Sequence, residues 1–368
     1  MRKSGALPIQ ELIAMKESGM LQNFPDDSFQ PSSADLSITD EIYRIKGNIL
    51  LKCTETVTDI IKNVTLFRHD LNNPLEPGGV YLCKVAEQVR LPKGIYGFTN
   101  PKSSTGRNDI HVRILADKVP HYDGIPEDFS GELWMLVSSR NFLLKLAPKD
   151  RLVQLRLFDD DTRLYETEMR IEYAKHKLLY AADGEPFTYD QLKISDRDGS
   201  IILTIDLGTQ EIIGYKARPK GQSPVLVFNQ KGHRIEDFFM PIEKPKNGHV
   251  VLENGQFYIF STLEWSRVPV MFAAEMAAMS TRLGEFRSHY AGFIDPGWGY
   301  GKDGELRGLP LVLEIRSFDE NLIIQHGQPI CKLKYERLRS IPSSVYGETG
   351  SNYVKQVGVL LSKHFRPI

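Results

Sequence analysis

The chain has 368 residues, of which 41% are hydrophobic and 25% are charged, and its formal net charge is -1. This length suffices for two domains of ordinary size, and the composition is that of a soluble globular protein. The near-zero net charge excludes broad electrostatic attraction to nucleic acid or anionic membranes, so an anionic ligand must be held by a local cluster of donors.

The cysteines and histidines show no metal-binding or disulfide pattern. Cys53, Cys83 and Cys331 are scattered without a Cys-x-x-Cys pair, and the nine histidines form no His-x-x-x-His pair. These spacings argue against a disulfide framework and a structural zinc site. The N-terminus lacks the apolar core of a signal peptide, and no run of about 18 apolar residues could span a membrane. We therefore expect a reduced, soluble, cytoplasmic protein.

The predicted elements begin with a helix over residues 8–19, because Pro8 suits a first-turn position and Gly19 a C-cap. Short strand-like runs between turn residues follow, and they predict a mainly β fold of the sandwich or barrel type. Residues 159–199 are polar and predict a solvated connector that contains a helix near residues 166–180. The strand-like runs cover residues 49–51, 80–82, 112–115, 133–137, 152–157 and 201–205.

A weak internal repeat links the two halves of the chain. The stretch that begins at Gly79 resembles the one that begins at Gly255, and the Arg-Leu-Pro at Arg90 resembles the Arg-Val-Pro at Arg267. The offset is about 175 residues with small slippages, and two copies of one β-domain explain it better than chance.

The first half carries a phosphate-binding-like motif in Lys102-Ser103-Ser104-Thr105-Gly106-Arg107. A triphosphate needs such a set, with hydroxyl donors, a glycine that permits close backbone approach, and cationic side chains. The alternative is a Ser/Thr-rich turn that enters a helix and uses its hydroxyls only as caps.

The second half carries a turn and a strand carboxylate. Ile294-Asp295-Pro296-Gly297-Trp298 is a turn by composition, and small residues before it leave room for a flat ring. An ordinary β-hairpin is the alternative. Glu314 lies in an apolar strand, so it is either paired, protonated or functional, or else it faces solvent by period-2 alternation. Residues 346–358 are glycine-rich and aromatic, and read either as a flexible tail or as a lid.

In this order the motifs resemble dCTP deaminase of the dUTPase-like superfamily. The family's Gln-Pro-Ser-Ser-x-Asp-Leu element matches residues 30–36, and its Ser-Ser…Arg motif matches Ser103, Ser104 and Arg107. Its Ala-Gly-Phe-Ile-Asp-Pro-Gly hairpin matches residues 291–297 without gaps. Its Val-Leu-Glu strand matches at Glu314, and its tail matches residues 346–358.

The chain departs from the family in length and in how the motifs are distributed. A usual member is about half this length and holds every motif in one domain. Here residues 119–128 lack the family hairpin, strand 133–137 lacks a carboxylate, and Glu132 is out of register. The second half has only Ser280 and Arg282 near its phosphate-motif position and an extra loop at 299–308. We therefore predict two dUTPase-like (β-clip or distorted-barrel) domains, 1–158 and 200–368, joined by the connector 159–199.

The resemblance implies hydrolytic, zinc-independent deamination of dCTP to dUTP and ammonia at a composite site between domains. Glu314 would be the general base, the carbonyl of Ala291 would hold the water, Ser103 would stabilise the tetrahedral centre, and Arg107 would hold the glutamate and water or the phosphates. Residues matched to substrate binding are Lys102, Ser104, Phe293, Ile294, Asp295, Trp298, Tyr346, Tyr353 and Gln356.

The resemblance further implies Mg²⁺ on the triphosphate rather than in a protein cage, and a homo-oligomer, usually a trimer in the family. The zinc-deaminase signatures His-x-Glu and Pro-Cys-x-x-Cys are absent from the sequence. Two alternatives stay open: a dUTP diphosphatase, alone or combined with deamination, in which Asp295 activates water, and a non-catalytic nucleotide-binding regulator. The expected small-molecule partner is dCTP, with dUTP and dTTP as further candidate nucleotides.

Overall fold

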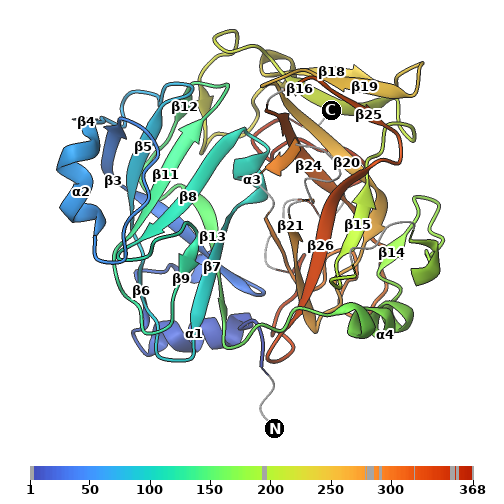
Figure 1. Cartoon of the computed structure of the whole chain (residues 1–368), viewed down its shortest axis with the longest axis horizontal. Helices are drawn as coiled ribbons and strands as arrows, with labels where there is room; N and C mark the ends of the chain where they lie inside the picture. Colours follow the sequence, from blue (N-terminus) through green and yellow to red (C-terminus); the bar gives the residue numbers. More distant parts are fainter. Residues whose placement is uncertain are drawn as a thin grey trace. The chain divides into compact units, whose positions relative to one another are not determined.

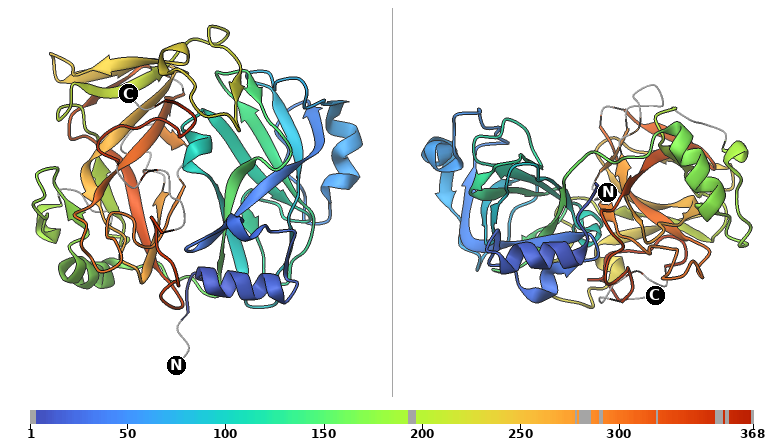
Figure 2. Two further views of the ribbon diagram at one scale, coloured as in Figure 1. Left: turned by 180° about the vertical axis from the view of Figure 1, so that it is seen from behind. Right: turned by 90° about the horizontal axis from the view of Figure 1, so that it is seen from below.

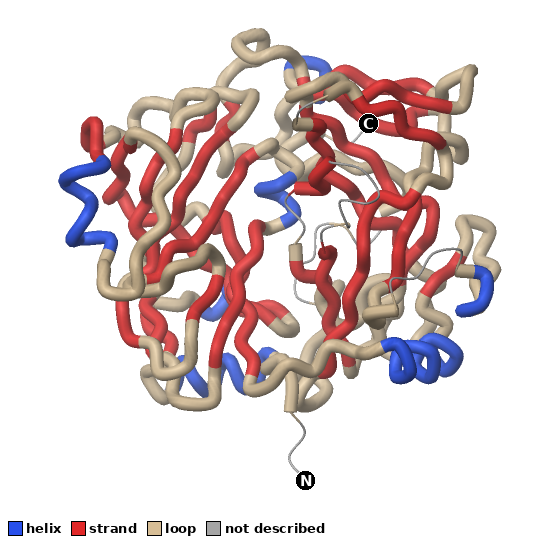
Figure 3. Tube along the Cα trace, viewed as in Figure 1, coloured by secondary structure: helices blue, strands red, loops and turns tan. Residues whose placement is uncertain are grey.

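The structure is a computed structural model, and it describes residues 4–192, 197–277, 279, 286–289, 292–318, 320–348, 353 and 356–366. The chain divides into two compact units. The N-terminal unit comprises Ala6–Asp160, Arg218–Phe238 and Ser362–Ile368. The C-terminal unit comprises Met1–Gly5, Asp161–Ala217 and Phe239–Leu361. Strands predominate in both units (Figure 3), so the predicted mainly β fold is confirmed.

The N-terminal unit is built on a sheet with the strand order β8-β11-β5-β3-β13-β7-β9, and β2 and β4 pair with β3 outside this path. A smaller sheet has the order β1-β6-β10, and β12 pairs in parallel with β17. The strands are β1 (Leu21–Gln22), β2 (Phe29–Gln30), β3 (Ser33–Ile45), β4 (Thr65–Arg68), β5 (Val80–Val85), β6 (Gln88–Arg90), β7 (Tyr96–Pro101), β8 (Ile110–Ala116), β9 (Gly124–Ile125), β10 (Ser130–Gly131), β11 (Leu133–Ser139), β12 (Leu144–Lys145), β13 (Arg151–Phe158) and β17 (Leu226–Val227).

Helices occupy three places in this unit. Helix α1 (Ile9–Glu17) confirms the predicted N-terminal helix and lies against β1, β2 and β3 (Figure 2). Helix α3 (Ser103–Gly106) is a single turn between β7 and β8. Helix α2 (Val57–Val64), which flanks β3 and β4 in Figure 1, is not among the elements predicted from the sequence. Short 3-10 turns lie at Asp26–Ser28 and Ile235–Asp237.

The signal for α2 was present in the sequence. Thr56 Oγ1 accepts from the Asp59 backbone N–H at 3.2 Å, and the Thr56 N–H donates to Asp59 Oδ2 at 2.8 Å, which completes a capping box. The apolar face of α2 packs on a cluster of buried side chains from the sheet, so α2 seals one face of it. The buried members of this cluster are Ile45, Leu51, Val57, Leu82, Leu115, Trp134 and Leu136.

The C-terminal unit has two larger sheets. One has the order β18-β16-β20-β24-β22, with β14 paired to β20, and the other has the order β15-β26-β21-β23, while β19 pairs with β25. The strands are β14 (Leu179–Tyr180), β15 (Ile201–Thr204), β16 (Ile212–Ala217), β18 (Phe239–Glu243), β19 (His249–Leu252), β20 (Phe257–Ser266), β21 (Phe272–Ala277), β22 (Phe286–His289), β23 (Phe293–Ile294), β24 (Leu309–Ser317), β25 (Leu322–Gln325) and β26 (Pro329–Arg337).

The stretch predicted as a connector contributes to the core of this unit. It forms α4 (Glu166–His176), β14 and a 3-10 turn at Tyr189–Gln191. Met169, Tyr173, Leu178 and Leu179 are buried in the same apolar cluster as strands of both sheets. The polar residues of this stretch therefore lie on the outside of a packed element. Among the helices that the structure describes, none is long and apolar enough to cross a lipid bilayer.

Candidate functional site

The phosphate-type motif forms the single-turn helix α3 in the N-terminal unit. The Lys102 backbone N–H donates to the Leu152 carbonyl at 3.0 Å, and Thr105 Oγ1 donates to the same oxygen at 2.9 Å, so α3 is tied to β13. Arg107 is buried. The Ser103 and Ser104 hydroxyls make no hydrogen bond to any residue that the structure describes, so they are not helix caps. Both hydroxyls are therefore available to a ligand.

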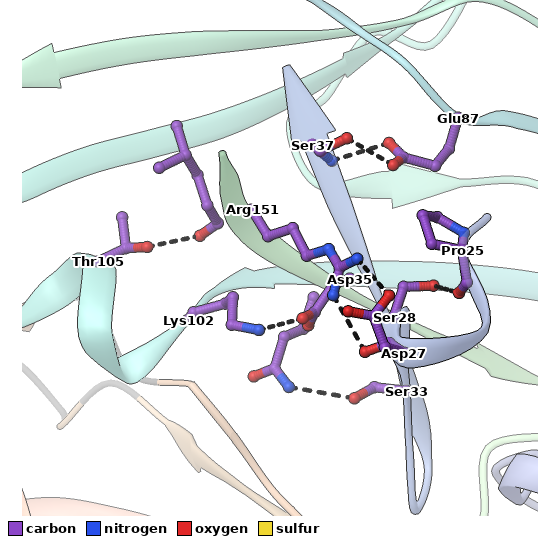
Figure 4. Close-up of polar contacts among 12 residues, drawn as sticks. Pro25, Asp27, Ser28, Ser33, Asp35, Ser37, Glu87, Lys102, Thr105 and Arg151 are labelled. Atoms are coloured by element: carbon purple, nitrogen blue, oxygen red, sulfur yellow. Dashed lines mark hydrogen bonds and ion pairs between the residues drawn. The ribbon is translucent and has the colours of Figure 1, made fainter. Parts of the chain in front are cut away.

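Two carboxylates hold cationic side chains beside this motif (Figure 4). Lys102 forms an ion pair with Asp35, and Arg151 Nη2 contacts Asp27 Oδ1 at 2.6 Å. Asp35 is 2% exposed, and its Oδ1 has no hydrogen-bond partner among the described residues. Asp35 belongs to the Gln-Pro-Ser-Ser-x-Asp-Leu element that resembles the family, and it is not among the site residues that the sequence predicts. The signal for it in the sequence was an aspartate between the apolar residues Ala34 and Leu36 of the family-like element.

The predicted nucleoside hairpin lies in the C-terminal unit, and Phe293, Ile294, Asp295 and Trp298 are all buried. The Val268 N–H donates to the Trp298 carbonyl at 2.8 Å, which fixes the turn against the Arg-Val-Pro segment. Trp298 Nε1 is buried and has no hydrogen-bond partner among the described residues. A buried, unpaired indole N–H is costly, so it is a candidate donor to a ligand.

Glu314 lies in the middle of β24 and is only 2% exposed, which excludes the solvent-facing alternative. Its neighbours Leu313 and Ile315 belong to the main apolar cluster of the unit. Because strand side chains alternate, Glu314 faces the opposite side of the sheet, where its cross-strand partner on β20 is Ile259. The carboxylate is therefore buried on the face of the sheet opposite the main apolar cluster, on a strand that has a neighbour on each side.

The tail is docked at three of its predicted residues. The rings of Tyr346 and Trp298 lie 4.9 Å apart, and the Tyr346 N–H donates to the Pro296 carbonyl at 2.8 Å. Gln356 is buried, and its Nε2 donates to the carbonyl of Pro310 on β24 at 2.6 Å. Tyr353 is also buried. The hairpin, the tail and the strand of Glu314 are thus joined by direct contacts within one unit.

The structure therefore divides the predicted site residues between the two units. Lys102, Ser103, Ser104 and Arg107 belong to the N-terminal unit, whereas the hairpin, the tail and Glu314 belong to the C-terminal unit. Their predicted roles stay predictions. The predicted catalytic carbonyl of Ala291, and also Ser280 and Arg282, lie outside the described residues. Within the described ranges, no group of three His, Cys, Asp or Glu side chains is placed to hold a metal ion.

Comparison with known proteins gives consistent matches to one family. Residues 3–161 match the N-terminal domain, and residues 151–365 the C-terminal domain, of the family described as 2'-deoxycytidine 5'-triphosphate deaminase. The crystal structure of 2'-deoxycytidine 5'-triphosphate deaminase from Agrobacterium tumefaciens superposes with a TM-score of 0.82 at 31% identity, covering 93% of this chain and 100% of that one. A deoxyuridine 5'-triphosphate nucleotidohydrolase from Methanocaldococcus jannaschii is 24% identical over 115 residues, which are 31% of this chain and 72% of that protein.

Proposed function

This chain belongs to the dCTP deaminase family and is an enzyme that deaminates dCTP, and we propose that Glu314 is the general base of that reaction. The observation that supports this role for Glu314 is its near-complete burial in an otherwise apolar strand. A buried carboxylate is costly unless it is paired or used, and a general base needs a proton affinity that such an environment can tune.

The reaction consumes one water molecule and releases one ammonia molecule for each dCTP converted to dUTP. Glu314 takes a proton from water as the water oxygen bonds to C4 of cytosine, and delivers it to N3. Glu314 then takes the proton of the new C4 hydroxyl and passes it to the exocyclic amino group, so that ammonia leaves as the C4–N bond breaks and the C4 carbonyl forms. The same carboxylate thus acts first as base and then as acid.

The other groups are assigned by their matches to the family. The Ala291 carbonyl would orient the water, and Ser103 would stabilise the tetrahedral centre. Phe293, Ile294, Asp295 and Trp298, with the docked tail, would enclose the nucleoside. Lys102, Ser104 and Arg107 would bind the phosphates. The two free hydroxyls of α3 and the unpaired indole N–H of Trp298 support these assignments, because each is a donor left without a protein acceptor among the described residues.

We further propose that both units contribute to one active site, supplied by a single chain or by neighbouring chains of a homo-oligomer. The support is the division of motifs, since each unit carries groups that the other lacks. The substrate would be the Mg²⁺ complex of dCTP, with the ion held by phosphate oxygens, because Asp27 and Asp35 are already engaged by cations. The mechanism needs no zinc ligand, and the sequence has no zinc-deaminase signature.

The test is to incubate the purified full chain with Mg·dCTP and, separately, with Mg·dUTP, and to measure ammonia and pyrophosphate. We expect ammonia from dCTP, and a loss of about 10²- to 10⁴-fold in Glu314→Gln at an unchanged melting temperature. A control is Glu264→Gln, which replaces a partly buried strand carboxylate of the same unit; Glu264 accepts hydrogen bonds from Thr204, and its variant should keep its activity per folded molecule.

The two alternative functions are separate outcomes of this assay. Pyrophosphate without ammonia would overturn the deaminase proposal in favour of dUTP hydrolysis. Binding of dCTP with no more ammonia from the wild type than from Glu314→Gln would favour a non-catalytic regulator. Both products from the wild type would indicate a bifunctional enzyme, with Glu314 required only for ammonia.

A further inference from the structure

Residues 362–366, here called the strap, leave the C-terminal unit and join the N-terminal unit. The His233 N–H donates to the His364 carbonyl at 3.0 Å, and the Arg366 N–H donates to the His233 carbonyl at 3.0 Å. The Phe365 and Phe238 rings lie 5.4 Å apart, edge to face. These contacts bind the strap to the segment Arg218–Phe238, which also returns to this unit.

The strap also contacts the phosphate-type motif. Ser362 Oγ donates to the Ser104 carbonyl at 3.1 Å, and Asn108 Nδ2 donates to the same oxygen at 2.9 Å. Asn108 Nδ2 lies 2.7 Å from His364 Nδ1. Because Asn108 is a donor here, His364 Nδ1 must accept, so the ring is neutral; burial lowers the pKa of His364 to about 3. The strap therefore holds the backbone of α3 in place through the hydrogen bond from Ser362 to the Ser104 carbonyl.

Lys363 lies between these two anchored residues, and its side chain is partly exposed, as are those of Lys102 and Ser103. Burial lowers the pKa of Lys363, and so does the charge of Lys102, whereas Asp35 raises it; Lys231 and Arg151 lower it further. Lys363, Lys102, Lys231 and Arg151 are thus close enough to interact electrostatically, and the carboxylates that act on Arg151 are Asp27, Asp35 and Glu87. Asp35 is paired with Lys102, and Asp27 is paired with Arg151. A local excess of positive charge attracts an anion.

We propose that Lys363 is a ligand of the substrate's triphosphate, carried by the strap to the same face of the N-terminal unit as Lys102 and Ser104. The proposal deepens the proposed function and rests on it. Lys102 and the α3 hydroxyls supply donors from β7 and α3, and Lys363 supplies a cation from a segment that no phosphate motif in the sequence includes. Phosphate oxygens recognise this combination of ammonium groups and hydroxyls.

The test uses the full chain with inorganic tripolyphosphate as probe, measured by titration calorimetry at low and high salt. Lys363→Gln should weaken binding about tenfold or more, and Lys363→Arg should retain most of it. With dCTP the same loss should appear in KM while kcat changes little, because a phosphate contact binds ground state and transition state alike. The control is Lys84→Gln, which removes a partly buried lysine of this unit that pairs with Glu132.

Unchanged tripolyphosphate affinity in Lys363→Gln would overturn the inference, as would equal losses in the Gln and Arg variants with a lowered melting temperature. If Lys363→Gln does not fold, Lys231→Gln is measured instead. Lys231 is exposed and its charge acts on Lys363, so its loss should weaken tripolyphosphate binding at low salt. Lys363-dependent binding without ammonia release would support the anion site and contradict the proposed reaction. The two failures are therefore distinguishable.

Discussion

Strand β11 of the N-terminal unit and strand β24 of the C-terminal unit hold the same place in their sheets. Leu136 of β11 pairs with Leu82 of β5, and Glu314 of β24 pairs with Ile259 of β20. The neighbouring pairs confirm the equivalence, because Tyr81 and Tyr258 precede Leu82 and Ile259 in the two units. Leu136 therefore stands where the other unit has its proposed base.

The two units share hydrogen bonds that a common origin explains. Glu87 accepts from the Ser37 N–H at 2.8 Å and from its hydroxyl at 2.6 Å. Glu264 accepts from the Thr204 N–H at 2.8 Å and from its hydroxyl at 2.7 Å. Burial raises the pKa of both carboxyls. The internal repeat seen in the sequence is thus a repeat of structure, down to individual contacts.

The difference between the units lies in what covers the face of the sheet. In the N-terminal unit, Leu136 and Trp134 belong to the apolar cluster beneath α2. The equivalent positions of the C-terminal unit are Glu314 and Val312. A carboxylate at position 136 would be sealed under a helix with no role for its charge. Covering this face is therefore a physical reason for the loss of the glutamate from one copy.

The hairpins of the two units also differ, and again the N-terminal unit lacks a side chain that the C-terminal unit has. Gly124 of β9 occupies the place of Phe293 of β23, since each precedes an isoleucine that pairs with the neighbouring strand. A side chain at Gly124 would meet the His121 ring at 2.1 Å, so the exposed His121 side chain would have to move to admit one. The N-terminal unit therefore has no counterpart of the nucleoside hairpin's aromatic residue.

Exchanging the two equivalent residues should give the largest effects. Leu136→Glu buries a charge beneath α2 and should cost about 3 kcal/mol or more of unfolding free energy without adding activity. Glu314→Leu should lower ammonia release by about 10²- to 10⁴-fold with a much smaller change in melting temperature. Calorimetry and the ammonia assay measure both. Wild-type stability in Leu136→Glu would show that α2 does not seal this face.

Gly297→Ala tests whether the contact between the hairpin and the tail contributes to dCTP binding. Gly297 has a φ of 91°, and an added Cβ would lie 2.9 Å from Val345 Cβ and 3.2 Å from the Tyr346 nitrogen. We expect a cost of about 1–2 kcal/mol and a several-fold rise in KM for dCTP, because Tyr346 must move away from Trp298. Gly248→Ala is the control, with a φ of 71° and nothing within 4 Å; equal KM values in the two variants would count against the tail's role.

One turn that the two units share has a titratable side chain, Asp150, in the N-terminal unit and an uncharged one, Gln328, in the C-terminal unit. Asp150 Oδ2 accepts from the Ala147 N–H at 2.8 Å, and Gln328 Oε1 accepts from the Gln325 N–H at 3.0 Å. Burial raises the pKa of Asp150 to about 6. A raised carboxyl pKa gives stability that is complete below pH about 4 and is lost as the pH rises through about 6.

Asp150→Asn should remove this pH dependence, which amounts to about 2–3 kcal/mol for a shift of about two units. The measurement is the free energy of unfolding of wild type and variant between pH 4 and 7, with Gln328→Asn as the control in the uncharged copy. Identical pH profiles for wild type and Asp150→Asn would contradict the assignment.

The smallest expected effect is a loss of unfolding free energy when a tyrosine hydroxyl is removed, and it should be equal in the two units. Tyr81 Oη accepts from the Glu76 N–H at 2.9 Å, and Tyr258 Oη accepts from the Glu253 N–H at 2.9 Å. Tyr81→Phe and Tyr258→Phe should each cost about 1 kcal/mol, because each removes one such hydrogen bond. Thermal unfolding measures both, and a difference of more than about 1 kcal/mol between them would show that the repeated contact is not energetically equivalent.

Motifs local in sequence were the part of the site that sequence could predict. The hairpin and Glu314 lie in short runs whose order resembles a family. The position equivalent to Glu314 in the N-terminal unit is Leu136, and Glu132 pairs with Lys84. Helix α2 was missed although its capping box is local. The contacts of Ser362 and His364 with α3 join residues more than 250 positions apart, and no periodicity or spacing encodes such pairing.

The strap has a consequence for how the protein is made. The body of the N-terminal unit ends at Asp160, but the strap is synthesised about 200 residues later, which takes roughly 10 to 40 s at usual translation rates. During that interval the nascent N-terminal unit holds α3 on the ribosome without the hydrogen bond from Ser362. A chain that stops before residue 362 would leave the ribosome with its helix α3 unsecured, however well its strands had paired.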